Sequence, residues 1–274
     1  MNKISIAVLI IILLIALFIM YSYFTTPSNL TNTVSLKNTQ SSTTTISKDK
    51  LQNRGNSSNW TISTWVYLNS TSNMNSTSMN TIISRGTMTT NTIPGTIYDF
   101  VLFFSLGNIA IPVVSDAPSA NKGVCLYCTF KSLTSTDTTD KNIVQITNDF
   151  PIQQWTQITV VIKNKNMIDY YLNGKLVFSY YASNIPTTTI SSDINIGASS
   201  TSNKYNYFNN GTELTEATTD AYLAKLNYFS TVLTPQQVYD NYLKGAGTGI
   251  SLPNYNLKLS LLNNNIEQKY YSLY

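Results

Sequence analysis

The sequence contains no histidine and few charged residues. Histidine is absent from all 274 residues, and charged residues make up 11% of the chain, which is less than half of the usual share of about 25%. Without an imidazole, mechanisms that use a histidine base and zinc sites that use histidine ligands are excluded. Two cysteines are too few for a disulfide-stabilised scaffold. The net charge of +4 comes without a basic cluster, which argues against a nucleic-acid partner.

Uncharged polar residues take the place of the missing charges. Asn, Ser and Thr together supply 100 residues, and hydrophobic residues make up 42% of the chain. This hydrophobic share is enough for a sizeable core, and the length suits one or two domains.

The segment Ile4–Phe24 is a nearly unbroken apolar run without charge, ISIAVLIIILLIALFIMYSYF. About 20 residues at about 1.5 Å each span the hydrocarbon layer, which is about 30 Å thick. Tyr21 and Tyr23 fall where an interfacial aromatic belt would lie. The alternative is a cleaved signal peptide, whose apolar core is about 7–15 residues long and precedes small residues, but Met20–Phe24 lacks such a pattern. We therefore expect an uncleaved transmembrane anchor in a lipid bilayer.

The charges around this anchor predict its orientation. Lys3 precedes the run, and the next charge is Lys37. By the positive-inside rule, residues 1–3 are expected in the cytosol. The C-terminal part is then extracytoplasmic, at a cell surface, in a lumen or on a virion envelope.

The chain after the anchor divides into three parts by composition. Residues 25–42 are rich in Thr, Ser and Asn and show no hydrophobic period, which is typical of a flexible stalk. Residues 43–248 contain short alternating runs that predict an all-β, two-sheet antiparallel sandwich, and residues 249–274 form a C-terminal extension. The expected strands are Trp60–Leu68, Thr81–Arg85, Asp99–Ser105, Gly123–Phe130, Asn142–Thr147, Trp155–Lys163, Ile168–Leu172, Leu176–Tyr180, Asp193–Gly197, Ala221–Phe229 and Leu257–Leu261.

Two local signals are the strongest in the chain. Asn173-Gly174 separates two alternating runs and predicts a hairpin with a type I′ turn, which needs positive φ at both positions. Thr234, Pro235 and Gln237 predict a helix that starts with a capping box and ends before Gly245.

Several segments resemble laminin G-like domains of the concanavalin A-like lectin/glucanase superfamily. These segments occur in the same order as in the family: Thr61–Val66, Trp155–Ile162, Tyr171–Val177, Ile194–Gly197, Leu223–Phe229 and Leu233–Val238. The resemblance implies a jelly roll of two curved antiparallel sheets that binds carbohydrate or protein, often with calcium. It also implies that Trp65 and Trp155 are core anchors and that Asn173 and Gly174 fix a hairpin.

The sequence departs from that family in places. The acidic residue usual after the closing Ile is Ala224 here, its neighbour is Lys225, and Gln236-Gln237 replaces a pair of glutamates. Asn69–Asn80 and Ser199–Thr219 are long insertions that we expect to be loops. Ligand binding that relies on the missing acids is therefore in doubt.

Catalysis is not expected. The glucanase branch places E-x-D-x-E on a strand, because glycoside hydrolysis needs two carboxylates. The chain has only Glu213, Glu216 and Glu267 and lacks this motif. Glu213 and Glu216 fall in a Gly/Thr-rich stretch, which we interpret as a solvated loop.

The pair Cys125 and Cys128 forms a C-x-x-C. It cannot complete a zinc site without histidine or a second pair, and it lacks a βαβ context for redox chemistry. Positions i and i+3 of a strand face opposite sides, which favours two unpaired cysteines in a strand. A local disulfide is the alternative if a turn separates them.

No cofactor is certain, although a structural calcium ion stays open. Carboxylates at strand ends or in loops are the candidate ligands: Asp99, Asp116, Asp193 and Asp220.

Tyr205 and Tyr207 in the insertion are candidate ligand contacts, although most tyrosines in a sandwich are partly buried. Six N-x-S/T sequons are candidate glycosylation sites, although chance produces them in such a composition: Asn29, Asn56, Asn59, Asn69, Asn75 and Asn210.

Together these patterns predict a single-pass, N-terminally anchored protein with one laminin G-like domain. The first hypothesis is a non-enzymatic recognition module that binds glycan or protein ligands. The alternative is a structural membrane or virion envelope protein whose sandwich packs in an assembly without a free ligand.

Overall fold

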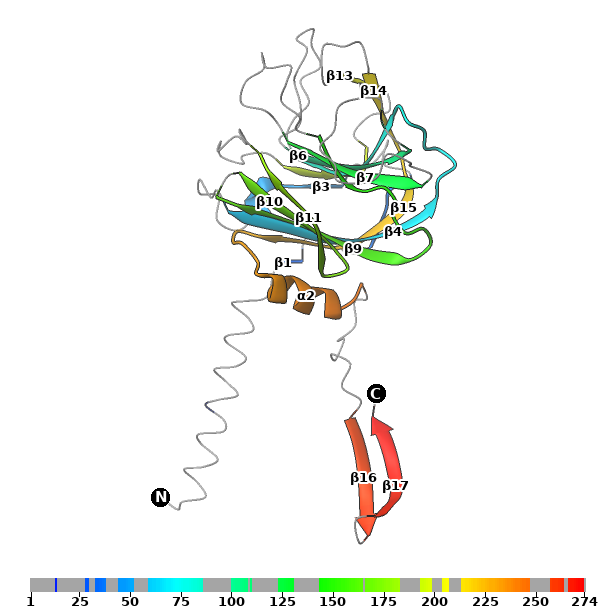
Figure 1. Cartoon of the computed structure of the whole chain (residues 1–274), viewed down its shortest axis with the longest axis vertical. Coiled ribbons are helices and arrows are strands. Elements are labelled where there is room, and N and C mark those ends of the chain that lie inside the picture. The colour runs from blue at the N-terminus through cyan, green and yellow to red at the C-terminus, as the bar shows by residue number, and fades with distance from the viewer. Residues whose placement is uncertain are drawn as a thin grey trace.

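The computed structural model describes part of the chain. This part comprises residues 13, 28–29, 33–37, 44–51, 59–85, 100–107, 109, 123–130, 143–164, 166–182, 193–198, 204–206, 213–246, 257–263 and 266–273. Two sheets pack face to face, as the sequence predicted, and one short helix lies beneath them in Figure 1.

Sheet A carries this helix. In spatial order it contains β1 (Ser28–Asn29), β15 (Asp220–Phe229), β4 (Trp60–Ser70), β9 (Trp155–Lys163), β10 (Met167–Leu172) and β11 (Lys175–Tyr181), and β2 (Val34–Ser35) also pairs with β15. All pairings in this sheet are antiparallel.

Sheet B lies on the other side of the core. In spatial order it contains β13 (Lys204–Asn206), β14 (Glu213–Ala217), β5 (Ser78–Arg85), β6 (Phe100–Leu106), β7 (Val124–Phe130) and β8 (Ile143–Thr147), with β12 (Ile194–Ile196) between β5 and β3 (Thr44–Ile46). Only the β14–β5 pairing is parallel among the described strands of this sheet. The remaining elements are a short 3-10 turn, η1 (Lys48–Lys50), and a separate hairpin of β16 (Leu257–Asn263) and β17 (Ile266–Leu273).

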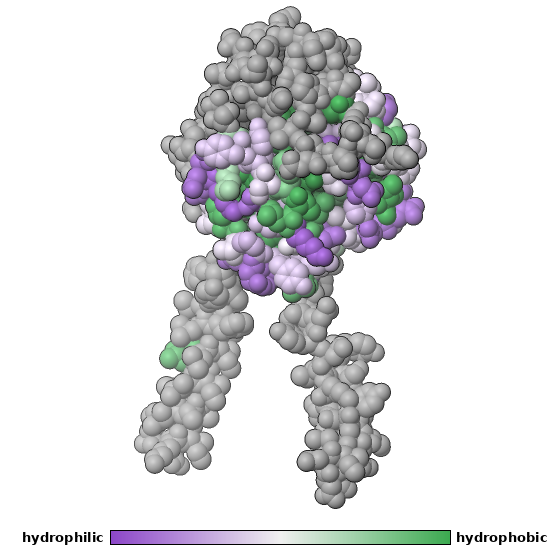
Figure 2. Space-filling view, viewed as in Figure 1, coloured by the Kyte–Doolittle hydropathy of each residue, from purple (hydrophilic) through white to green (hydrophobic). Residues whose placement is uncertain are grey.

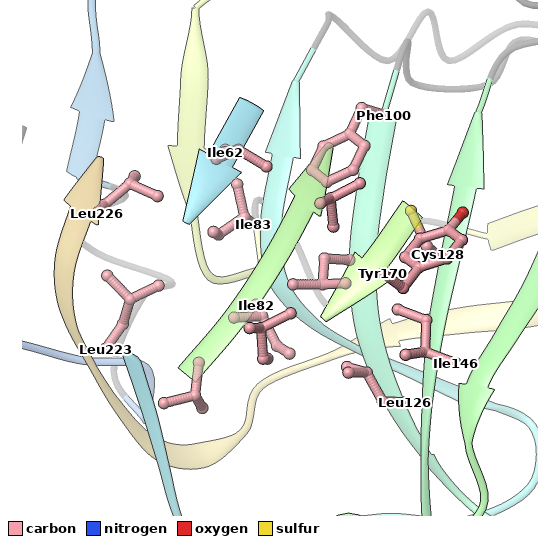
Figure 3. Close-up of a cluster of buried hydrophobic side chains, with 14 of the residues drawn as sticks. Ile62, Ile82, Ile83, Phe100, Leu126, Cys128, Ile146, Tyr170, Leu223 and Leu226 are labelled. Atoms are coloured by element: carbon pink, nitrogen blue, oxygen red, sulfur yellow. The ribbon is translucent and has the colours of Figure 1, made fainter. Parts of the chain in front are cut away.

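The core lies between the sheets and follows the two-residue period of the strands. Ile158, Val160 and Ile162 of β9 face it together and are buried, as the sequence predicted. Trp60 packs between Phe100 and the ring of Tyr228, at centroid distances of 5.7 and 6.1 Å. Figure 3 shows side chains from both sheets meeting in this core. Each fully buried side chain of this kind contributes about 1.5–3 kcal/mol.

A second apolar cluster covers the other face of sheet B, which is therefore buried on both faces. Its members include Val101, Phe103 and Tyr127, whose ring stacks on that of Phe103 at 5.3 Å. Cys125 belongs to this cluster, whereas Cys128 faces the core between the sheets. Both cysteines are free, which confirms unpaired strand cysteines. Because both faces of sheet B are covered, β7 is buried at every position.

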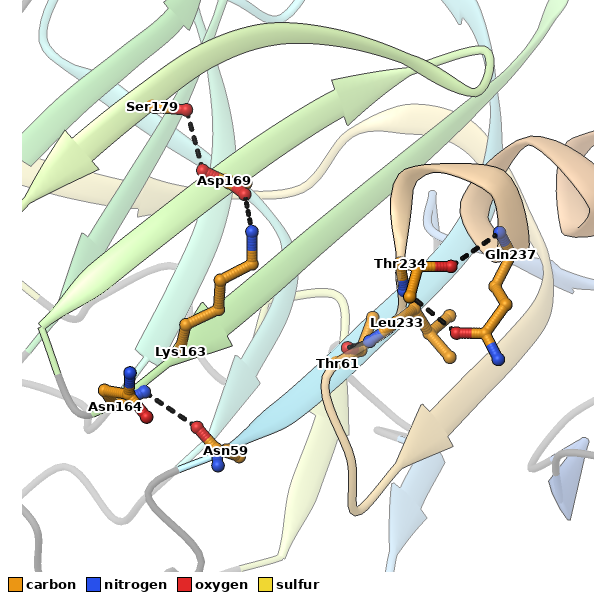
Figure 4. Close-up of polar contacts among 9 residues, drawn as sticks. All are labelled: Asn59, Thr61, Lys163, Asn164, Asp169, Ser179, Leu233, Thr234 and Gln237. Carbon is orange, nitrogen blue, oxygen red and sulfur yellow. Dashed lines mark hydrogen bonds and ion pairs between the residues drawn. The ribbon is translucent and has the colours of Figure 1, made fainter.

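Helix α2 (Pro235–Leu243) covers part of the outer face of sheet A. Thr234 and Gln237 form the predicted capping box (Figure 4). Val238 packs in a cluster with Tyr171 of β10 and Val161 of β9. Tyr242 stacks on Trp65 at 5.6 Å between ring centroids.

A bulge in β15 helps to hold the end of this helix. Lys225 has a φ of 48° and lies where the register between β15 and β4 shifts. Its Nζ donates to the carbonyl oxygens of Lys244 and Gly245, at 3.3 and 2.8 Å. A cation at a helix C-terminus is favourable for the helix dipole, so the lysine beside Ala224 takes a structural role.

The expected stalk at 25–42 is wrong for the residues that the structure describes there. Ser28 and Asn29 pair with Tyr228 and Asn227, and Val34–Ser35 pairs with Leu223 and Tyr222. Leu36 is fully buried and its N–H donates to the carbonyl of Ala221 at 2.8 Å. The sequence does not indicate these strands, because they are polar and because edge strands of two residues are too short to show a hydrophobic period.

The expected loop around Glu213 and Glu216 is also wrong. Both residues belong to β14, and Glu216 is buried and accepts a hydrogen bond from Thr81 Oγ1 at 3.1 Å. Residues 204–206 of the same insertion form β13. Thr- and Glu-rich strands like these escape a search for apolar alternation, because their partners are polar groups.

The Asn173-Gly174 turn of the β10–β11 hairpin is confirmed and lies against α2. Asn173 and Gly174 have φ values of 50° and 74°, as a type I′ turn requires. A Cβ atom at Gly174 would meet side-chain atoms of Tyr239 and Tyr242 at 3.0 Å. Gly107 also has positive φ, at 70°, but has open space around its Cα.

We predict that Gly174→Ala destabilises the protein more than Gly107→Ala. Both substitutions incur the cost of a left-handed backbone, about 1–2 kcal/mol, but only the first adds overpacking of about 1–3 kcal/mol. Chemical denaturation of both variants measures the difference. Equal losses would show that α2 is not packed on this turn.

Buried acids give the fold a pH dependence. Burial raises the pKa of the Cys128 thiol and of the Tyr127 and Tyr170 phenols above their ordinary values. The Cys128 and Tyr170 side chains lie side by side in the core (Figure 3). The folded state therefore favours the neutral forms, so their contribution to stability is complete below the unfolded pKa values, about 8.5 for thiols and about 10 for phenols. It is lost as pH rises through the higher folded values.

We predict that the free energy of unfolding falls between pH 8.5 and 11. The slope approaches about 1.4 kcal/mol per pH unit for each such group. Tyr170→Phe should reduce the slope, whereas Tyr181→Phe, at an exposed position, should leave it unchanged. Urea denaturation at a series of pH values measures this, and identical slopes for wild type and Tyr170→Phe would contradict the explanation.

Candidate ligand-binding surface

The four candidate calcium ligands do not form a site in the described part of the chain. Asp99 and Asp116 lie outside the described residues. Asp193 precedes β12 in sheet B, and its Oδ1 accepts the N–H of Lys48 at 2.8 Å. Asp220 begins β15 in sheet A. The described residues contain no group of three or more Cys, Asp or Glu side chains that would hold a metal.

The candidate tyrosines are not tested by the structure. Tyr205 lies in β13, where it pairs with Leu214, but its side chain is outside the described part, as is the whole of Tyr207. They stay predictions.

The described sequons lie at the surface or in edge strands. Asn69 and Asn75 are exposed, and Asn59 is half-buried and accepts the N–H of Asn164 at 2.7 Å (Figure 4). Asn29 lies in β1, and Asn56 and Asn210 lie outside the described residues. Surface exposure permits glycosylation of Asn69 and Asn75 but does not test it.

Trp155 is the residue that the sequence analysis placed wrongly. It is 36% exposed and lies on the outer face of sheet A, not in the core. The alternation of β9 explains this, since Ile158, Val160 and Ile162 face inward and odd-numbered positions face outward. The core position that the family resemblance implied for Trp155 is therefore wrong, because the alternation of β9 points this residue outward. Trp65 is buried as expected, but beneath α2 on the outer face.

Three aromatic side chains form a row across the outer face of sheet A, here called the aromatic row: Tyr222, Tyr67 and Trp155. The register places Tyr222 of β15 opposite Tyr67 of β4, and Tyr67 opposite Trp155 of β9. Ring centroids are 6.4 Å apart for Tyr222–Tyr67 and 5.6 Å apart for Tyr67–Trp155, with interplanar angles of 56° and 55°. Tyr222 is 41% exposed. The row therefore presents aromatic surface to solvent across three neighbouring strands.

Polar side chains adjoin one end of the row. Asn69 follows Tyr67 by two residues, and its Nδ2 donates to Asp220 Oδ2 at 3.1 Å. Lys37 Nζ lies 3.7 Å from the same oxygen. Asp220 precedes Tyr222 by two residues. An amide, a carboxylate and an ammonium thus lie beside the tyrosine end of the row.

Two buried polar atoms nearby have no hydrogen-bond partner among the residues that the structure describes. They are Oε1 of Gln157, two residues after Trp155, and Oγ1 of Thr219, which precedes Asp220. Gln157 is opposite Trp65 in the β4–β9 pairing, between the row and α2. A buried acceptor without a donor costs about 1–3 kcal/mol, but Gln157 is only 2% exposed, so this atom is not open to a ligand at the surface.

The chemistry of this surface favours binding over catalysis. It offers aromatic faces with hydrogen-bond donors and acceptors. Its one carboxylate, Asp220, is held by Asn69 and Lys37. Elsewhere in the described residues, Asp169 is paired with Lys163 and accepts from Ser179 at 2.7 Å (Figure 4).

Comparisons with known proteins agree with the fold. The family model described as the concanavalin A-like lectin/glucanases superfamily, a laminin G model, matches residues 37–239. No curated protein matches the chain.

The chain is also distantly similar to solved structures. The binding domain of botulinum neurotoxin DC, in complex with rat synaptotagmin II, is 13% identical, with a TM-score of 0.43, over 72% of this chain and 38% of that chain. A heptameric SAP-like pentraxin from Limulus polyphemus is 15% identical, with a TM-score of 0.40, over 66% of this chain and 68% of that chain. At these values the similarities carry no inference about ligands, and the chain spans little more than a third of the neurotoxin domain. Because the family model covers most of its length, the chain belongs to the concanavalin A-like lectin/glucanase superfamily, with a laminin G-like domain.

Proposed function

We propose that the protein is a membrane-anchored, non-enzymatic recognition module that binds glycan or protein ligands on the far side of a membrane. The observation that carries the proposal is the aromatic row, with Asn69, Asp220 and Lys37 beside it. Aromatic side chains with one apolar face and adjacent polar groups are typical of binding surfaces. Membership of the superfamily fits this function but does not fix the ligand.

The proposed anchor rests on the apolar run Ile4–Phe24 of the sequence. Of that run the structure describes only Leu13, and no helix in the described residues has the length and hydrophobicity needed to cross a bilayer. Only three residues separate the run from β1, so Phe24 and Ser28 are at most about 14 Å apart. The antiparallel register places Ser28 opposite Tyr228, so the chain enters sheet A at the end of β15 that leads into α2.

This entry point would keep the aromatic row away from the bilayer. Tyr222 and Tyr228 lie opposite Tyr67 and Ile62, which are five residues apart on β4, or about 17 Å. A ligand approaching from the far side of the membrane would therefore reach the row.

A second candidate is packing in an assembly without a free ligand. The observation that favours it is β11, an edge strand of sheet A among the described strands. Leu176 and Val177 are 54% and 43% exposed, and Figure 2 shows apolar side chains at the surface above α2, on the side of the β10–β11 hairpin. Exposed apolar edges favour association with another chain.

We predict that the full chain stays in the membrane fraction after alkaline carbonate extraction, whereas a chain that starts at Thr26 is released. The reason is that about 20 apolar residues would leave the bilayer only at a large cost. Release of the full chain would rule out the anchor.

We predict that the full chain in lipid nanodiscs shows saturable binding on a broad glycan array. Binding should be measured with calcium and with a chelator. A folded protein that binds nothing on the array, but is found only in a stoichiometric assembly that Val177→Lys disrupts, would favour the second candidate.

A further inference from the structure

We infer that the aromatic row is a carbohydrate-stacking site that works without a metal ion. The inference rests on the proposed function and deepens it, because it names the place, the ligand class and the independence from calcium. The place differs from the insertion tyrosines that the sequence singled out, and of the candidate aspartates it includes only Asp220.

The geometry of the rings suits a chain of sugars. The row crosses β15, β4 and β9, and each ring is inclined by about 55° to its neighbour. A rigid planar ligand cannot lie flat on all three rings at these angles. An oligosaccharide rotates about each glycosidic bond, so successive pyranose rings can each turn an apolar C–H face toward Trp155, Tyr67 and Tyr222.

The polar groups beside the row suit hydroxyl groups. Sugar hydroxyls both donate and accept hydrogen bonds, as the serine and threonine hydroxyls do. Lys37, whose side chain is 59% exposed, and Asn69 supply donors, and Asp220 supplies an acceptor.

The electrostatics oppose a bound cation at this place. Asp220 already accepts from Asn69 and lies close to the ammonium of Lys37. A calcium ion would have to displace Lys37 and find several further oxygens, and the described residues contain no group of three or more Cys, Asp or Glu side chains that could hold it. Binding at the row is therefore expected to ignore chelators.

The position of α2 favours a narrow ligand over a protein surface. Tyr242 of α2 stacks on Trp65, which precedes Tyr67 by two residues on the same face of β4. The helix has a diameter of about 10 Å, so it stands above the surface of sheet A beside the row. A protein interface needs about 800 Å² per partner, and a broad surface would meet α2 before it met the row.

The test uses the full chain in lipid nanodiscs and three neutral β-linked probes, cellohexaose, chitohexaose and laminarihexaose. Isothermal titration calorimetry in EDTA measures affinity. We expect at least one probe to bind, with affinity lowered at least tenfold by Trp155→Ala and by Tyr222→Ala. Trp155→Phe keeps an aromatic face and should stay within about threefold of wild type. The matched control, Tyr181→Ala, removes an exposed tyrosine on β11, and affinity should not change.

Three results would overturn the inference. Binding that Trp155→Ala and Tyr222→Ala leave unchanged would place the site elsewhere, and the proposed function would stand. Binding that disappears in EDTA would contradict a metal-free site. If no probe binds and a protein ligand is instead lost in the Trp155→Ala variant, the carbohydrate assignment fails while the recognition function stands.

Discussion

The alternation of side chains along the central strands of sheet A is the constraint on which the rest of the structure depends. Even-numbered residues of β9, such as Val160, enter the core, and odd-numbered residues face α2 or solvent. A shift of one residue would expose the core and bury Trp155. The same register that packs the sandwich therefore builds the aromatic row, which exists only because β15, β4 and β9 align Tyr222, Tyr67 and Trp155.

Local and regular features could be predicted from the sequence, whereas irregular ones could not. The hairpin at Asn173-Gly174 and the capped helix after Thr234 depend on neighbouring residues, so their signals are complete in the sequence. The edge strand at Ser28–Asn29 and the buried Glu216 depend on partners far along the chain, and polar composition hid both. The core position that the family resemblance implied for Trp155 is wrong, because the alternation of β9 points its side chain to the outer face of sheet A.

The site could be predicted only in its residue types. Tyrosines were expected to contact a ligand, but no spacing in the sequence brings Tyr67, Tyr222 and Trp155 together, because the register of three strands does so. Asp220 was one of four candidate calcium ligands, and in the structure its partners are Asn69 and Lys37. The fold thus supplies a surface with aromatic faces, donors and an acceptor, about 17 Å along the sheet from the point where the chain enters it.

The most direct test of this surface is fluorine NMR of the full chain labelled with 5-fluorotryptophan. The chain has three tryptophans, and of these Trp60 and Trp65 are buried whereas Trp155 is partly exposed. The account predicts that a saturating oligosaccharide ligand shifts the Trp155 resonance and leaves the Trp60 resonance in place. A ligand that binds without moving the Trp155 resonance would contradict the central claim.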